Sequence, residues 1–259
     1  MSRRDILELG LVGKSCLVTG GAQGLGRAIC LGLAKEGVNV AVNYKSSETK
    51  AMELAELVER EYSVKAVAIG GDVSSEHDVG NMFDVAVKGL GGLDLLVNNA
   101  GVCPTSFVVD MSLQIWSDVM ATNLTGTFLA CRQMARYLIG EGKPGKIVNI
   151  CSQTAMNGSK SGKSHYAASK GGMLTFTNSF AKEVAKHDIA VNAVSPGMMF
   201  TEMNSDKPGS ELEEYNERIP IGRIATVEEV AAGVVFLCSS ASSYMTGSNL
   251  DISGGMIGR

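Results

Sequence analysis

The stretch Ser15-Cys-Leu-Val-Thr-Gly-Gly-Ala-Gln-Gly-Leu-Gly26 joins a short apolar run to a glycine-rich turn, and apolar residues then recur at helical spacing as far as Leu33. Glycine allows a sharp turn and lets the backbone approach a ligand closely. The first N–H groups of the helix that follows can bind an anion such as a phosphate. The stretch therefore predicts a strand, a phosphate-binding turn and a helix. Taken alone, the same stretch would also fit a tight strand–helix connection that binds no ligand.

The rest of the chain alternates between the same two patterns. Short apolar runs predict strands at residues 15–19, 38–42, 64–69, 93–97, 146–150, 190–194 and 249–252. Amphipathic segments predict helices at residues 48–62, 78–89, 113–138, 164–186 and 227–237, with a polar, irregular stretch before the last of them. This alternation favours a parallel sheet with helices on both faces, in which ligands bind at the carboxyl ends of the strands. In that setting the glycine turn indicates a dinucleotide site.

The composition fits a single globular domain of residues 1–259. Hydrophobic residues make up 45% of the chain and charged residues 19%. The net charge of −4 argues against a nucleic-acid partner, and no run of 18 apolar residues suggests a membrane span. Residues 1–9 include acidic side chains where a signal peptide needs an apolar stretch, so a cytoplasmic location is expected. The six cysteines form no CxxC pair, which predicts reduced thiols and no metal site.

Ser152, Tyr166 and Lys170 are the residues that most clearly predict chemistry. Positions 166 and 170 lie one turn apart on one helix face, so the Lys170 ammonium can lie near the Tyr166 phenol. A free phenol has a pKa of about 10, and a nearby positive charge lowers that pKa toward the range useful for acid–base catalysis. Ser152, at an expected strand end, can hydrogen-bond the same substrate oxygen. A Tyr-x-x-x-Lys pair alone would more often be an ordinary surface pair, but here every chemical motif follows a strand end.

The end of the second expected strand bears on the choice of dinucleotide. Sites selective for NAD usually place an acid there, on the ribose 2′-hydroxyl. This chain instead reads Asn43-Tyr44-Lys45-Ser46, in which Lys45 and Ser46 would suit a 2′-phosphate. NADP(H) is therefore favoured and NAD(H) is the alternative, as it would be if Lys45 were simply solvated. Asp72, at the end of the third expected strand, is expected either to accept a hydrogen bond from the adenine amino group or to cap a helix.

Taken together, these residues resemble the short-chain dehydrogenase/reductase family over nearly the whole chain. The resemblance is carried, in the family's order, by the turn at residues 19–26, Asp72, Asn98-Asn99-Ala100-Gly101, Asn123, Ser152, Tyr166, Lys170, Pro196-Gly197 and Thr201. It implies an α/β fold with a three-layer, Rossmann-type, doubly wound parallel sheet of about seven strands in a single domain, usually in a homotetramer. It also implies hydride transfer between a nicotinamide and a carbonyl or secondary alcohol.

The resemblance assigns roles to individual residues. Tyr166 would be the general acid in reduction and the general base in oxidation, while Ser152 would hydrogen-bond the substrate oxygen. Lys170 would lower the pKa of Tyr166 and hold the nicotinamide ribose, and Asn123 would position a water that links Lys170 to solvent, or bend its helix. The residues expected to contact the cofactor are Gly20, Gln23, Gly24, Leu25, Gly26, Asn43, Tyr44, Lys45, Ser46, Asp72, Val73, Asn99, Ala100, Gly101, Tyr166, Lys170, Pro196, Gly197 and Thr201.

The resemblance leaves the substrate open. The chain is most similar to the branch named for 3-oxoacyl-carrier-protein reductases, which also holds sugar, polyol and diketone dehydrogenases. Gln23 stands where NADP-selective members often carry a basic residue, and this weighs against NADP(H). We expect a cofactor-binding half at about residues 12–150 and a catalytic and substrate half at about 151–259, with a lid at about 198–222. The sequence favours small carbonyl, sugar or polyol substrates and acyl carriers equally. A non-catalytic nucleotide-binding regulator is disfavoured because all four catalytic positions are filled.

Overall fold

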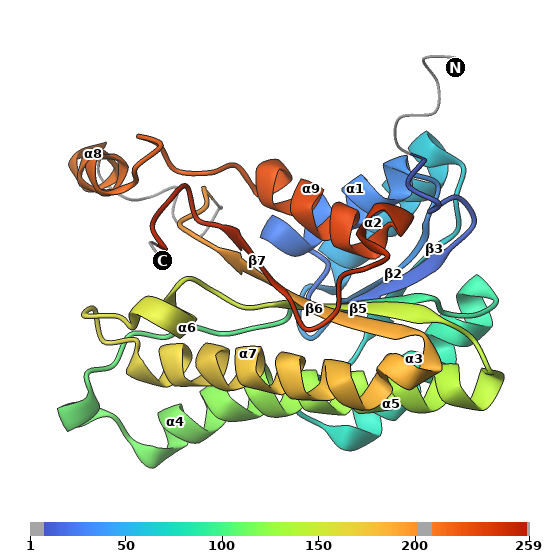
Figure 1. Ribbon diagram of the computed structural model, residues 1–259, viewed down its shortest axis with the longest axis horizontal. Helices are drawn as coiled ribbons and strands as arrows, with labels where there is room; N and C mark the ends of the chain where they lie inside the picture. The colour runs from blue at the N-terminus through green and yellow to red at the C-terminus, as the bar shows by residue number, and fades with distance from the viewer. Residues whose placement is uncertain (1–7, 201–208, 258–259) are drawn as a thin grey trace.

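The computed structural model describes residues 8–200 and 209–257, and its centre is a seven-stranded sheet between two layers of helices (Figure 1). The strands lie in the order β3-β2-β1-β4-β5-β6-β7, and every neighbouring pair is parallel. Their bounds are β1 Ser15–Val18, β2 Asn39–Tyr44, β3 Ala66–Gly70, β4 Leu95–Asn98, β5 Gly145–Ile150, β6 Ile189–Pro196 and β7 Asn249–Ile252. The predicted doubly wound α/β fold is confirmed.

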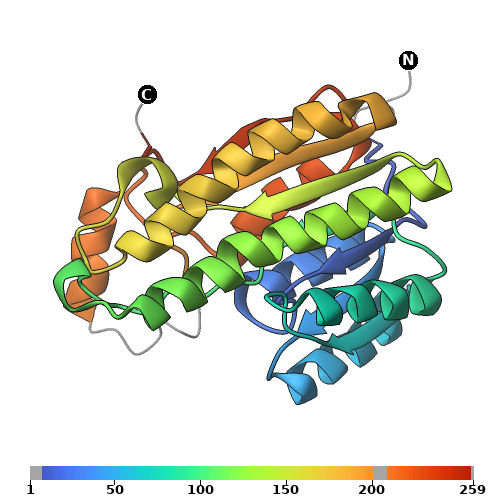
Figure 2. The ribbon, with the colours of Figure 1, turned by 90° about the horizontal axis from the view of Figure 1, so that it is seen from below.

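Three helices pack on each face of the sheet. One layer is formed by α1 (Gly24–Lys35), α2 (Glu48–Tyr62) and α9 (Val227–Cys238). The other is formed by α3 (Glu76–Leu90), α5 (Gly126–Glu141) and α7 (Ser164–Val184), which cross in front of the sheet in Figure 2. Shorter helices are α4 (Leu113–Met120), α6 (Thr154–Asn157) and α8 (Gly209–Arg218).

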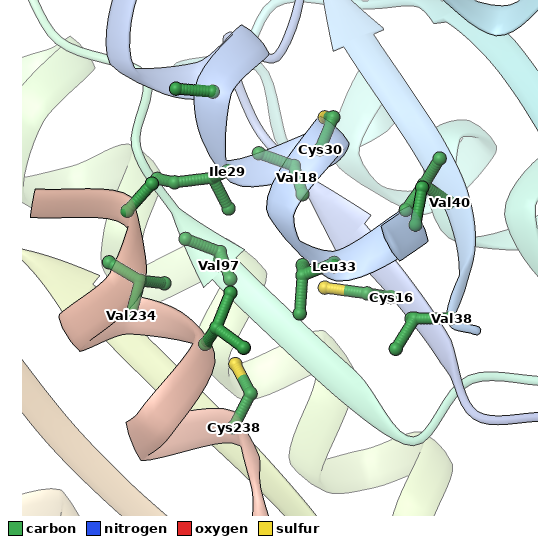
Figure 3. Close-up of a cluster of buried hydrophobic side chains, with 14 of the residues drawn as sticks. Cys16, Val18, Ile29, Cys30, Leu33, Val38, Val40, Val97, Val234 and Cys238 are labelled. Atoms are coloured by element: carbon green, nitrogen blue, oxygen red, sulfur yellow. The ribbon is translucent and has the colours of Figure 1, made fainter. Parts of the chain in front are cut away.

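The strands are apolar along their length because both of their faces are covered. In β1, Cys16 and Val18 point into the core beneath α1 and α9, while Leu17 points into the opposite core, and all three are fully buried. This two-residue alternation is a property of any strand, so a central strand must be apolar at every position. Figure 3 shows the first core, where Ile29 of α1 and Val234 of α9 meet side chains of β1 and β4.

Two expectations about the helices need correction. The helical stretch expected at 113–138 is not one regular helix: α4 and α5 are separated by a π-helical turn at Ala121–Thr125, and α5 continues to Glu141. Part of the stretch expected to be irregular forms α8, whose glutamates, leucine and arginine are good helix formers. The other predicted elements are present, with ends that differ by a few residues.

The strand order places the site. The sheet runs outward from β1 in one direction through β2 and β3, and from β4 in the other direction through β5, β6 and β7. Loops that leave β1 and β4 therefore turn to opposite faces and open a crevice above their carboxyl ends, where ligands of such sheets bind. The glycine turn follows β1 and the Asn98–Gly101 turn follows β4, so both lie at this crevice.

Candidate active site

The glycine turn is held in shape by the end of β4. Gly20 and Gly24 have positive φ angles of 59° and 52°, a conformation that other residues rarely adopt. The Thr19 hydroxyl oxygen accepts hydrogen bonds from the backbone N–H groups of Asn99 and Ala100, at 3.0 and 3.1 Å. The Asn99 side-chain nitrogen donates to the carbonyls of Thr19 and Gly20, at 3.0 and 2.9 Å. These bonds tie the turn to β4 where the strand order reverses.

Gly26 lets the first turn of α1 approach the glycine turn closely. A Cβ at this position would collide with the carbonyl oxygen of Gly20 and would lie 2.7 Å from the Asn99 side-chain nitrogen. Gln23, the residue before the helix, makes no capping hydrogen bond through its side chain to the described part of the chain. The first N–H groups of α1 are thus left to a ligand, as a pyrophosphate site requires.

Asn43 braces the turn from the end of β2. Its side-chain oxygen accepts a hydrogen bond from the Gly20 N–H at 3.1 Å, and its nitrogen donates to the carbonyls of Ile69 and Gly71 at 3.3 and 3.0 Å. Only 2% of Asn43 is exposed. Because its side chain is engaged within the protein, the structure gives Asn43 a supporting place beneath the expected cofactor.

Lys45 and Asp72, from the ends of β2 and β3, form an ion pair with Nζ and Oδ2 2.6 Å apart. The other Asp72 oxygen accepts hydrogen bonds from the N–H and hydroxyl of Ser74, at 2.9 and 2.7 Å. Partial burial raises the pKa of Asp72, but the hydrogen bonds from Lys45 and Ser74 outweigh it and hold that pKa below its usual value. Asp72 does not itself cap α3, since the capping side chain there is Ser75.

The expected catalytic side chains come from the end of β5 and the beginning of α7. Ser152 lies two residues beyond β5 and is buried, while Tyr166 and Lys170 lie one turn apart in α7. The Lys170 Nζ is 5.7 Å from the centre of the Tyr166 ring. It donates a hydrogen bond to the Ile150 carbonyl at 2.6 Å. The fold thus brings together the three residues that the sequence motif singled out.

Burial dominates the electrostatics of these groups. It raises the pKa of the Tyr166 phenol, with a further increase from nearby Cys103, and a hydrogen bond with the Ser152 side chain opposes the shift. Burial also lowers the pKa of the Lys170 ammonium. The expected lowering of the phenol pKa by Lys170 is not seen in the structure, where the net shift is upward. Tyr166 is therefore a neutral phenol at physiological pH, the form that donates a proton.

Asn123 lies in the π-helical turn between α4 and α5 and is fully buried. Its side-chain oxygen accepts from the Val102 N–H at 2.8 Å, and its nitrogen donates to the Val102 carbonyl and the Ser169 hydroxyl, both at 3.0 Å. A Cβ on Gly101 would lie 3.3 Å from this oxygen and 3.7 Å from Lys170 Nζ. The turn after β4 and the catalytic helix therefore meet at Asn123, and π-turns of this kind are frequent at functional sites.

Pro196 and Gly197 close the far side of the site at the end of β6. The Pro196 carbonyl accepts a hydrogen bond from the Gln153 N–H, and the Gly197 N–H donates to the Ile252 carbonyl, both at 3.0 Å. A Cβ on Gly197 would lie 2.9 Å from the Ser253 backbone, so the two segments pack closely. Thr201, expected to contact the cofactor at the end of this loop, lies outside the described residues.

The remaining expected cofactor residues divide into buried and exposed groups. Leu25 and Val73 are buried. Ser46 is exposed beside Lys45, and the Tyr44 hydroxyl donates to a Glu48 carboxylate oxygen at 3.0 Å.

Sequence reasoning missed three residues of the site. Thr19 was expected only as the last residue of a strand and the first residue of the glycine turn and was given no bonding role, although its hydroxyl joins the two turns. Cys103 is exposed and close enough to Tyr166 to affect the pKa of its phenol. Thr154 donates two hydrogen bonds to Ser152. Each of the three follows a strand end by a few residues, and that position could have marked it as part of the site.

Residues 8–200 and 209–257 contain no helix with the length and apolar character that crossing a membrane requires. They also contain no group of three or more histidine, cysteine or acidic side chains that could hold a metal ion.

Comparison with known proteins shows the family. A family model described as enoyl-(acyl carrier protein) reductase matches residues 20–257. A crystal structure of a short-chain type dehydrogenase/reductase from Mycobacterium marinum is similar, with a TM-score of 0.91 and 34% identity over 97% of this chain and 98% of that one. A putative short-chain alcohol dehydrogenase from Sinorhizobium meliloti has a TM-score of 0.90 and 34% identity over 96% and 98% of the two chains. The chain belongs to the short-chain dehydrogenase/reductase family and is an oxidoreductase.

Curated relatives indicate the branch. The 3-oxoacyl-[acyl-carrier-protein] reductase of Aquifex aeolicus is 40% identical over 250 residues, which is 96% of this chain and all of that protein. The protein of the same name from Staphylococcus epidermidis is 36% identical over 243 residues, 94% of this chain and 98% of that one. The predicted resemblance to this branch is confirmed.

Proposed function

We propose that the protein interconverts a carbonyl and a secondary alcohol by hydride transfer with NADP(H), with Tyr166 as the general acid and base. The observation that carries the proposal is the meeting of Ser152, Tyr166 and Lys170 beside the Asn123 turn, at the carboxyl edge of the sheet and next to the glycine turn. A bound nicotinamide supplies or accepts the hydride. The protein's own part is to orient the substrate oxygen and to move one proton.

The residues of the glycine turn suit a dinucleotide. Two glycines with positive φ and a third with no room for a Cβ form a close backbone cradle at the uncapped end of α1. A pyrophosphate placed there would receive N–H groups and the positive end of the helix dipole. Lys170, one turn from Tyr166, would hold the nicotinamide ribose.

In reduction, the neutral Tyr166 phenol donates its proton to the substrate oxygen while Ser152 donates a hydrogen bond to the same atom. Burial favours this direction, because it keeps the phenol protonated. In oxidation the phenolate takes the proton from the alcohol. Lys170, the Asn123 turn and a water between them would then pass that proton to solvent.

We favour 3-oxoacyl groups on a carrier protein, or a small carbonyl of similar shape, as the substrate. Support comes from the two curated relatives, both 3-oxoacyl-[acyl-carrier-protein] reductases that align over nearly their whole length. The test is initial-rate absorbance at 340 nm over β-ketoacyl thioesters, sugars, polyols and diketones, each with NADPH or NADP⁺ and with NADH or NAD⁺. Turnover of the thioesters with NADPH is expected. Turnover confined to a sugar or polyol would make the protein a catabolic dehydrogenase.

Lys45 is the residue on which the preference for NADP(H) depends. Its ammonium lies at the end of β2, where the 2′-phosphate would be placed, and it neutralises Asp72. Lys45→Ala would remove a cation and leave the Asp72 carboxylate to repel the phosphate. We expect the Kd for NADPH to rise about tenfold, the effect of one hydrogen bond to a charged group, discounted for the exposure of Lys45. The Kd for NADH should change little.

Lys88→Ala is the matched control, because Lys88 is an exposed lysine in the last turn of α3. It should leave both dissociation constants unchanged. Fluorescence titration of NADPH and NADH measures the binding directly. Equal loss of affinity for the two cofactors in Lys45→Ala, or tighter binding of NADH than NADPH by the unaltered protein, would contradict the preference.

We further propose the division of labour expected from the sequence, with residues 12–150 binding the cofactor, residues 151–259 binding the substrate and residues 198–222 acting as a lid. We also propose a homotetramer in the cytoplasm. Exposed apolar side chains on α4 and α5 support an association of subunits, and they include Leu113, Trp116 and Phe128.

A further inference from the structure

The hydroxyl of Ser152 receives two hydrogen bonds from one neighbour, Thr154. The Thr154 N–H lies 3.2 Å from the Ser152 hydroxyl oxygen, and the Thr154 hydroxyl lies 3.0 Å from it. Thr154 is the first residue of α6, and both residues lie just beyond the end of β5. Neither the motif nor the comparisons assign a role to Thr154.

These two bonds determine what Ser152 can do with its own proton. A serine hydroxyl has one hydrogen to donate and two lone pairs that accept. Thr154 occupies both lone pairs, so the remaining interaction of Ser152 is a donation. Tyr166 lies close enough to Ser152 for the Ser152 hydroxyl to lower the pKa of its phenol. The Ser152 proton is therefore directed toward the place where the phenol meets the substrate.

We propose that Thr154 is a positioning residue that fixes Ser152 as a hydrogen-bond donor to the reacting oxygen of the substrate. The inference rests on the proposed carbonyl–alcohol chemistry. During reduction, the carbonyl oxygen gains negative charge as the hydride reaches the carbon, and the Tyr166 proton moves to that oxygen. Ser152 keeps its own proton throughout and stabilises the developing charge.

This arrangement favours the transition state over the bound substrate. A donor that is already aligned stabilises an oxyanion more than a neutral carbonyl, because the charge on oxygen is larger in the transition state. Thr154 should thus act on kcat and hardly on KM. Without the Thr154 hydroxyl, Ser152 has a free lone pair and can accept a hydrogen bond from the phenol, which favours the protonated form of Tyr166.

The test is Thr154→Val, which keeps the shape of the side chain and the backbone N–H bond but removes the hydroxyl. We expect kcat for reduction to fall about 3- to 10-fold, the effect of one ordinary hydrogen bond, with KM unchanged. In oxidation, the acid limb of the pH profile of kcat should move to higher pH, since the phenol loses its proton less readily. Thr154→Ser restores the hydroxyl and should restore both the rate and the profile.

Three controls separate this role from a purely structural one. Thr175→Val changes an exposed threonine on the same helix as Tyr166 and should behave as the unaltered protein. The thermal unfolding midpoint and the Kd for NADPH should be the same in Thr154→Val as in the unaltered protein. A change in KM alone, or failure of Thr154→Ser to restore the rate, would overturn the inference.

The inference and the proposed function fail in different ways. Thr154→Val with an unaltered kcat and pH profile, beside an inactive Tyr166→Phe, would overturn only the role of Thr154. Full activity of Tyr166→Phe would overturn the proposed function itself, and the inference with it.

Discussion

Tyr166→Phe is expected to lower the rate of carbonyl reduction by about 10²- to 10⁴-fold, the usual contribution of a general acid. The substitution removes only the phenol oxygen, so the ring still packs within 6 Å of the Lys170 ammonium, as it does now at 5.7 Å. Steady-state kinetics at 340 nm with the best substrate of the panel measure the loss. Binding of NADPH should be nearly unchanged.

Tyr62→Phe provides the matched control. Tyr62 is the last residue of α2 and precedes the edge strand β3, away from the helix that carries Tyr166. The Tyr62→Phe variant should therefore keep full activity. If Tyr166→Phe turned over substrate as fast as Tyr62→Phe, the phenol would not be the proton donor. The alternative of a non-catalytic nucleotide-binding protein would then gain support.

Gly26→Ala is expected to have the largest effect on the fold of the cofactor site. Its new Cβ would collide with the Gly20 carbonyl oxygen, and the nearby Asn99 side chain is fixed by two hydrogen bonds to the same turn. Because backbone atoms cannot move aside cheaply, we expect the free energy of unfolding to fall by about 1–3 kcal/mol, as for other overpacked sites. Affinity for NADPH should also fall, since the turn must open. Urea unfolding and fluorescence titration measure the two effects.

Gly80→Ala is the matched substitution for that experiment. Gly80 lies within α3, and a Cβ there would meet nothing within 4 Å. Alanine is favoured over glycine in a helix, so this variant should be about 0.5–1 kcal/mol more stable, with cofactor binding unchanged. A Gly26→Ala protein as stable as Gly80→Ala, with full affinity for NADPH, would show that the turn is not closely packed.

The candidate catalytic residues were predictable because they depend on local spacing. Tyr166 and Lys170 are one helical turn apart in any helix, and Ser152 follows an apolar run long enough to be a buried strand. The electrostatic consequence was not predictable. The sequence suggested that Lys170 would lower the pKa of the phenol, whereas burial raises it. The charge interaction with Cys103, which is distant in the sequence, raises it further.

The cofactor site likewise combines features that depend on local spacing with features that depend on strand pairing. The glycines of the turn were evident from their spacing, because a positive φ and a close approach of the backbone both demand glycine. The partner of Lys45 was not evident, since Asp72 is 27 positions away and meets Lys45 only because β2 and β3 pair in parallel register. Helix bending at Asn123 was one of two expected roles, but the bonds that join Asn123 to Val102 in another segment were not evident from the sequence.

By itself the sequence determined the alternation of strands and helices, the position of the glycine turn and the residue proposed as the proton donor. These follow from periodicity and steric rules that act over a few residues. Only the tertiary structure decided the strand order, the meeting of the turns after β1 and β4 and the ion pair of Lys45 with Asp72. These depend on which distant segments pack together, as does the burial that sets the pKa of Tyr166.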